Sequence, residues 1–69
     1  MQMIINGKNK TISNNTTLAA LLNELNIDAQ RVAVELNMNI VENGEYAQRV
    51  LKDGDTLEII SFVGGGTNG

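Results

Sequence analysis

The side chains that most enzymes use for catalysis are scarce in this 69-residue chain. It contains no cysteine and no histidine, and its eight carboxylates are spread along the sequence. The chain therefore lacks the side chains needed for catalysis by a cysteine thiolate or by a serine–histidine pair. A structural zinc site, which is built mainly from cysteine and histidine, lacks its ligands as well. The composition predicts a protein that is not an enzyme and that binds no metal.

Two acidic residues flank a glycine in the segment Asp53-Gly54-Asp55. A calcium-binding loop needs further oxygen ligands at regular spacing, and the neighbouring residues do not supply them. Aspartate is common in tight turns because its carboxylate accepts hydrogen bonds from nearby backbone N–H groups. We therefore predict that this segment is a structural turn.

The run Gly64-Gly65-Gly66 is the most unusual short segment. No helix follows it, so it cannot aim amides and a helix dipole at a phosphate. Glycine does let a backbone pass where any Cβ would clash. We predict that residues 1–63 form one domain and that residues 64–69 extend from it as a flexible tail. A loose terminus without function is the alternative that composition alone favours.

The charge pattern argues against nucleic acid as a partner. The net charge is −3, the five basic residues are scattered, and only Tyr46 and Phe62 are aromatic. No basic face or stacking platform is therefore expected. The apolar runs are far shorter than the ~20 residues that span a bilayer, and no signal-peptide pattern is visible. We expect a cytoplasmic protein that binds other proteins.

Alternating hydrophobicity predicts a β-hairpin at the start of the chain. Residues 1–6 place alternate apolar side chains on one face of a strand. Asn6-Gly7 then supplies two residues that accept positive φ in a type I′ turn. The returning segment, 8–13, carries two lysines and one bulky apolar residue, which is typical of an exposed edge strand.

One short helix is predicted after the hairpin. Thr16 and Thr17 are good N-cap residues, and Asn26 can take the left-handed conformation that ends a helix. Between them, four leucines follow the i, i+3, i+4, i+7 spacing of a helix face: Leu18, Leu21, Leu22 and Leu25. Two to three turns are too few for an isolated helix. We therefore predict that the leucine face packs on a sheet.

Three further strands complete the predicted order, at 31–36, 40–41 and 56–63. The last of them is apolar nearly throughout, as expected of a central strand that is buried on both faces or lies parallel to its neighbour. The irregular segment that precedes it, 42–51, contains three predicted apolar anchors: Tyr46, Val50 and Leu51. The sequence thus predicts an α+β roll in which one helix packs on a mixed sheet of about five strands.

Six segments form a recognisable set: Asn6-Gly7, Thr16 to Leu22, Arg31 to Asn37, Ile40-Val41, Leu51 to Asp55 and Phe62 to Gly66. Together they resemble the ThiS family of sulfur-carrier proteins, which have a ubiquitin-like β-grasp fold. The resemblance extends from residue 1 to residue 66 in matching order. Its most specific pieces are Arg31 to Asn37 and the turn Lys52 to Asp55, because a terminal Gly-Gly alone recurs across the superfamily.

The resemblance implies a sulfur carrier for the thiazole moiety of thiamine. In this family a ThiF-like adenylyltransferase uses ATP to activate the terminal carboxylate, and a persulfide donor then supplies sulfur to form a thiocarboxylate. A ThiG-like thiazole synthase takes that sulfur. Mapped onto this chain, Gly66 carries the thiocarboxylate, and the partner's channel recognises Gly64 and Gly65. The carrier itself is expected to bind no cofactor.

The partner interface is expected on the last strand, at Phe62 and Val63. The alternative for Phe62, a place in the core, is equally open. The chain departs from the family at Thr67-Asn68-Gly69, which leaves Gly66 without a free carboxylate. These residues are removed by a protease, are additions from cloning, or make Gly69 the activated residue. The last option places the Asn68 side chain where the channel expects glycine.

Other readings of the same sequence remain open. A MoaD-like carrier for molybdopterin synthesis and a carrier for tRNA thiolation belong to the same class, but such proteins usually have longer chains. A β-grasp module that binds proteins and has an inert tail belongs to a different class. The modification of the terminal carboxylate distinguishes the carriers from the binding module.

Overall fold

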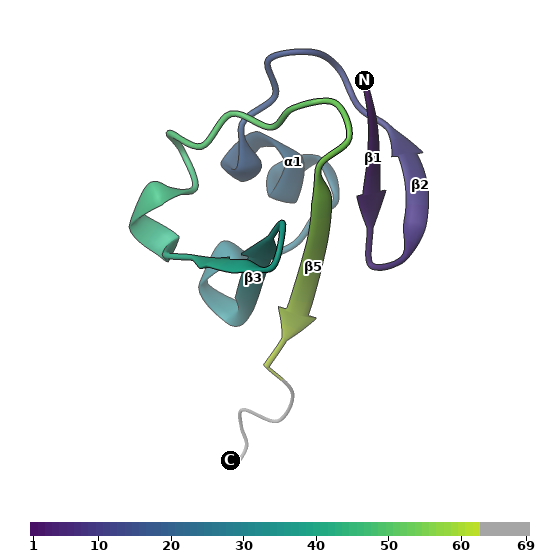
Figure 1. The fold of residues 1–69 in the computed structure, drawn as a ribbon. Coiled ribbons are helices and arrows are strands. Elements are labelled where there is room, and N and C mark those ends of the chain that lie inside the picture. The colour runs from purple at the N-terminus through teal and green to yellow at the C-terminus, as the bar shows by residue number, and fades with distance from the viewer. Residues whose placement is uncertain (63–69) are drawn as a thin grey trace.

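In the described part of the chain, five strands form one mixed sheet, and a single α-helix packs on one face of it (Figure 1). The computed structural model describes residues 1–62. The elements are β1 (Gln2–Ile5), β2 (Lys8–Thr11), α1 (Leu18–Glu24), η1 (Ala29–Arg31), β3 (Val32–Leu36), β4 (Asn39–Val41), η2 (Asn43–Glu45) and β5 (Thr56–Ser61). The strands lie in the order β2-β1-β5-β3-β4, with β1 and β5 parallel and the other pairs antiparallel. The predicted α+β roll is therefore confirmed.

The first hairpin follows from its turn residues. Asn6 and Gly7 have φ values of 50° and 82°, which is the pair of positive angles that a type I′ turn needs. The turn directs β2 back along β1 at the edge of the sheet, where all four β2 residues are exposed. The predicted hairpin and its exposed edge strand are confirmed.

The helix begins and ends where capping chemistry places its termini. The Thr17 hydroxyl accepts a hydrogen bond from the Ala20 N–H at 3.1 Å, which satisfies one of the free donors of the first turn. After the helix, Asn26 takes a φ of 59°, and Ile27 N–H donates to the Leu22 carbonyl at 2.9 Å. These contacts close the helix in the way that the sequence predicts.

The helix buries three of the four predicted leucines, which are Leu18, Leu21 and Leu22. Leu25 is 39% exposed, so its predicted place in the core is wrong. The helix ends at Glu24 and Leu25 is the C-cap, with a ψ of 1°. The chain has left the helical path there, so the spacing rule no longer places this side chain on the buried face.

The core lies between α1 and the sheet face that it covers. It also takes in side chains from the irregular segment before β5, where Tyr46 is 4% exposed and Leu51 is 2% exposed. These two predicted anchors are confirmed. Val50 is 44% exposed and is not an anchor. It contributes a backbone bridge to Thr17 instead.

The turn before β5 is structural, as predicted. The Asp55 carboxylate accepts hydrogen bonds from Lys52 N–H at 2.8 Å and from the Asn37 side-chain amide at 2.9 Å. The Asp53 carboxylate accepts from Gln2 N–H at 2.7 Å. These bonds tie the start of β5 both to β1 and to the turn between β3 and β4.

The buried apolar residues of the described part of the chain form one core cluster, and the predicted domain, 1–63, stays a prediction. Its boundary with the predicted tail, 64–69, lies outside the described residues and stays a prediction. Between residues 1 and 62, no helix is long and apolar enough to cross a membrane.

Candidate functional site

Strand β5 is the centre of the sheet and leads to the glycine run. It pairs with β1 on one side and with β3 on the other. On the helix-facing side, Leu57 is fully buried and Ile59 is half-buried. The residues that alternate with them are exposed, at 49% for Ile60 and 60% for Phe62. The strand is therefore central and lies parallel to β1, as the sequence predicted. The other predicted option, burial on both faces, does not hold, since α1 covers only one face of the sheet.

Exposed apolar side chains gather on the face of the sheet that α1 does not cover, which we call the open face. Ile60 lies opposite the small side chain of Ala33, one strand away. On the far side of β3, Ile40 is 65% exposed. With Phe62 and Ile4, which is 38% exposed, these residues form an interrupted apolar surface across four strands. Such a surface on a small domain indicates a site for another protein.

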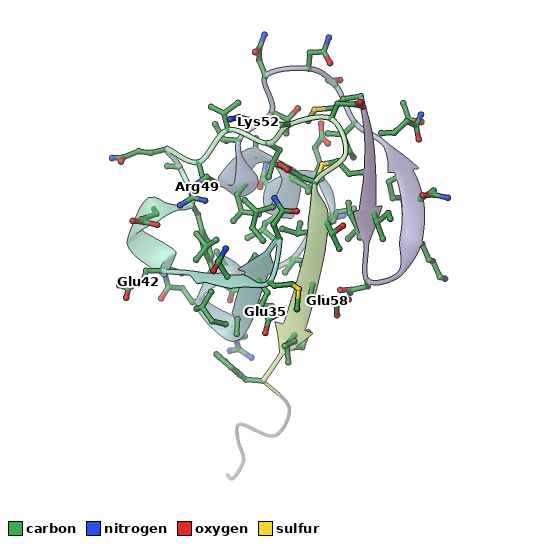
Figure 2. The ribbon with its side chains drawn as sticks, viewed as in Figure 1. Glu35, Glu42, Arg49, Lys52 and Glu58 are labelled. Atoms are coloured by element: carbon green, nitrogen blue, oxygen red, sulfur yellow. The ribbon has the colours of Figure 1, made fainter. Side chains whose placement is uncertain are left out.

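Two carboxylates interrupt this apolar surface. Glu58 lies directly opposite Glu35 in the pairing of β5 with β3, and Glu35 lies opposite Ile40 in the pairing of β3 with β4. Figure 2 shows the two labelled glutamates on these neighbouring strands. The open face therefore combines apolar and negative groups in one place.

The last described residue is held to the sheet. Phe62 N–H donates a hydrogen bond to the Arg31 carbonyl at 2.9 Å, which continues the β3–β5 pairing beyond Ser61. Phe62 is exposed, which places it on the surface rather than in the core. Val63, Gly64, Gly65 and Gly66, the other predicted site residues, lie outside the described residues.

The ionisable groups of the described residues offer no centre for acid–base catalysis. Burial raises the pKa of the Tyr46 phenol above its usual value, but Tyr46 belongs to the core between helix and sheet. Residues 1–62 hold no group of three or more histidine, cysteine, aspartate or glutamate side chains that could bind a metal ion.

The sequence alone indicated Phe62 but none of five other residues of the open face: Ile4, Glu35, Ile40, Glu58 and Ile60. A signal for Ile60 was present, because two consecutive isoleucines at 59 and 60 break the alternation of a strand with one buried face. No comparable local signal existed for the glutamates. Their proximity depends on the register between β3 and β5, which only the folded chain sets.

Within residues 1–62, a five-stranded mixed sheet with β5 at its centre packs around one α-helix, and this arrangement defines a ubiquitin-like β-grasp protein (Figure 1). Comparison with solved structures agrees. The crystal structure of the thiamine biosynthesis protein ThiS from Geobacter metallireducens superposes with a TM-score of 0.83 at 35% sequence identity. The match covers 96% of this chain and 100% of that one.

The chain belongs to the ThiS family, whose family model matches residues 3–66. A thiazole synthase of Paramagnetospirillum magneticum is 47% identical over 68 residues, which are 99% of this chain but 21% of that protein. The chain thus spans about a fifth of the length of the thiazole synthase it matches. An uncharacterized protein of Pyropia yezoensis, ycf40, is 42% identical over 62 residues, which are 90% of this chain and 87% of that protein.

Proposed function

We propose that this protein is a sulfur carrier for the thiazole moiety of thiamine, and that it is a co-substrate of partner enzymes rather than an enzyme. The observation that carries the proposal is the end of β5. There the exposed side chains of Ile60 and Phe62 are followed within four residues by Gly64-Gly65-Gly66. Membership of the ThiS family supports the same function, and the family match ends at the last of these glycines.

The proposed chemistry takes place at the carboxylate of Gly66. A carboxylate is a poor electrophile, so one of its oxygens first attacks the α-phosphorus of ATP in a ThiF-like adenylyltransferase, and pyrophosphate leaves. The terminal sulfur of a cysteine persulfide attacks the acyl-adenylate, and AMP leaves. This forms a carbon–sulfur bond to Gly66 and leaves an acyl disulfide that still holds the sulfur–sulfur bond of the persulfide. A thiolate then attacks the sulfur of the donor cysteine, breaks that sulfur–sulfur bond and forms a disulfide with the donor. The thiocarboxylate stays on Gly66, and its sulfur passes to a ThiG-like thiazole synthase.

The proposal explains why this carrier needs no catalytic side chains. Residues 63–66 span at most roughly 13–14 Å when extended, which is enough to enter the active-site channel of another protein. Glycines at 64 and 65 let the backbone pass where a side chain would clash. We propose that the form that reacts ends at Gly66, after removal of Thr67-Asn68-Gly69.

The test is an intact-mass measurement on two forms of the protein, one ending at Gly66 and one with all 69 residues. Each form is incubated with a ThiF-like adenylyltransferase, ATP and a cysteine-persulfide donor. We expect the form ending at Gly66 to gain the mass difference between one sulfur and one oxygen. If neither form gains it, the carrier function is refuted.

The variant Gly65→Val, made in the form that ends at Gly66, tests whether the tail needs glycine to enter the partner's channel. We expect it to keep the fold but to gain no sulfur, since its side chain obstructs the entry of the tail. Gly44→Val is the matched control, because a Cβ added at Gly44 meets no atom within 4 Å. Normal activation of Gly65→Val would contradict the role of the glycines.

The acceptor enzyme distinguishes thiamine synthesis from the other sulfur pathways. The thiocarboxylate form is offered separately to a ThiG-like thiazole synthase and to the large subunit of a molybdopterin synthase. We expect loss of sulfur from the carrier, with formation of the thiazole, only in the first reaction. Transfer only in the second would assign the protein to molybdopterin synthesis.

A further inference from the structure

The pair Glu35–Glu58 is an unfavourable arrangement for the isolated protein. The two residues are directly opposite one another on the open face, and side chains in that position have Cβ atoms about 5 Å apart. Like charges at this spacing destabilise a sheet. Within residues 1–62 the two salt bridges are Arg31–Asp28 and Arg49–Glu45. No hydrogen bond in that range reaches either carboxylate of the pair.

The surroundings of the pair are apolar rather than basic. Ile40, on β4, lies directly opposite Glu35. Ile60 follows Glu58 by two residues on the same face of β5. Both isoleucines are about half exposed or more, at 65% and 49%. A protein that covers them removes water from the carboxylates as well. Two desolvated negative charges without a cation would then oppose binding strongly, so the covering surface must bring a positive charge.

An arginine fits this position better than a lysine. Its planar guanidinium carries five N–H donors, which can serve two neighbouring carboxylates at once. It is weakly hydrated, and its flat face can lie against apolar side chains such as Ile60. A lysine ammonium is a compact, strongly hydrated charge and loses more on burial.

We propose that the Glu35–Glu58 pair determines partner specificity by receiving an arginine from the enzyme that adenylates the tail. The inference rests on the proposed function, because that function supplies the partner. Glu58 is four residues before Phe62, which at about 3.3 Å per residue is about 13 Å along β5. An enzyme that closes around Gly66 has to cover only this length of the strand to reach the pair. Binding of this arginine would explain why the sheet retains two like charges that destabilise it.

The proposal predicts opposite effects on stability and on binding. In the double variant Glu35→Gln/Glu58→Gln, the charge repulsion disappears and the side chains keep their size. We expect the melting temperature to stay the same or rise, and the affinity for the adenylyltransferase to fall about 10- to 100-fold. Because the lost attraction is ionic, the affinity of the variant should also depend less on salt.

The control is Glu24→Gln, which removes one negative charge from the exposed end of α1, in the layer opposite the open face, and it is also compared with each single variant, Glu35→Gln and Glu58→Gln. Titration calorimetry at low and high salt gives the affinities, and thermal unfolding gives the stabilities. Wild-type affinity in the double variant, or a fall of affinity as large in the control, overturns the inference. A fall in melting temperature does so too, because it assigns the pair a structural role.

The same experiment separates this inference from the proposed function. If the wild-type form ending at Gly66 binds the enzyme and gains sulfur, the carrier function stands whatever the variants do. If the double variant then binds as well as the wild type, only the role of the glutamates fails. If the wild type neither binds nor gains sulfur, the proposed function fails, and this inference fails with it.

Discussion

The Asn6 side chain extends the hydrogen bonding between β1 and β5 beyond the point where β1 ends. Its backbone N–H donates to the Leu57 carbonyl at 2.8 Å, and the chain then turns away from β5. The side-chain oxygen accepts from Ile59 N–H at 2.7 Å, and the side-chain amide donates to the Ile59 carbonyl at 3.3 Å. The asparagine thus pairs with both backbone groups of Ile59, which the turning strand cannot reach.

Asn6→Gly removes these two bonds without straining the turn. The backbone φ of 50° suits glycine. The main loss is therefore that of two hydrogen bonds, each of which contributes about 0.5–1.5 kcal/mol to the free energy of unfolding. We expect a loss of about 2 kcal/mol in the free energy of unfolding. For a domain of this size that lowers the melting temperature by about 8–16 °C. Asn6→Ala should lose about 1 kcal/mol more, because its Cβ is strained at positive φ.

Asn15 supplies the matched control. It has a φ of 64°, is exposed, and its side chain makes no hydrogen bond within residues 1–62. Asn15→Gly therefore repeats the backbone change without the loss of bonds to β5. Urea and thermal unfolding give the stabilities, and hydrogen exchange of the Ile59 amide reports the local effect. If Asn6→Gly is as stable as Asn15→Gly and the exchange rate is unchanged, the side-chain pairing contributes nothing and the reasoning is wrong.

Two further predictions concern stability and pH. Met38 is 91% exposed at a φ of 72°, so Met38→Gly should relieve backbone strain without loss of packing. We expect urea unfolding to show a rise of about 0.5–1 kcal/mol in the free energy of unfolding. A clear decrease in that free energy would contradict this prediction. Burial raises the pKa of the Tyr46 phenol above 10.0. Its contribution to stability is therefore complete below pH 10 and is lost as the pH rises through the folded-state pKa, a loss that Tyr46→Phe should abolish in unfolding curves measured against pH.

Local rules predicted those parts of the fold that depend on a few neighbouring residues. Asn6-Gly7 indicated a type I′ turn, and Thr17 indicated a helix start, because each acts on backbone groups within three positions. The same rules failed at Leu25 and Val50. Leu25 is the C-cap of α1, and Val50 lies in the irregular segment between η2 and β5. In both places the path of the chain rather than periodicity decides which side chains are buried.

The last strand marks the limit of hydrophobic patterning. Its apolar residues predicted a central strand that is buried on both faces or lies parallel to a neighbour. The strand is central and parallel to β1, but Ile60 and Phe62 are exposed, so it is not buried on both faces. The sequence pattern shows which side chains are apolar, but it does not show whether each one is buried in the folded protein. Because one α-helix is present in residues 1–62, the second face of β5 stays uncovered and its apolar side chains remain exposed.

The sequence by itself determined that this protein has no cysteine or histidine with which to catalyse a reaction, and that a run of three glycines follows the apolar segment 56–63. It also determined the order of strands and helix, because turn residues and periodicity are local. Only the tertiary structure decided which apolar residues remain exposed and that Glu35 faces Glu58. These residues are far apart in the chain, and their register is set by the burial of one face of both strands against a single helix.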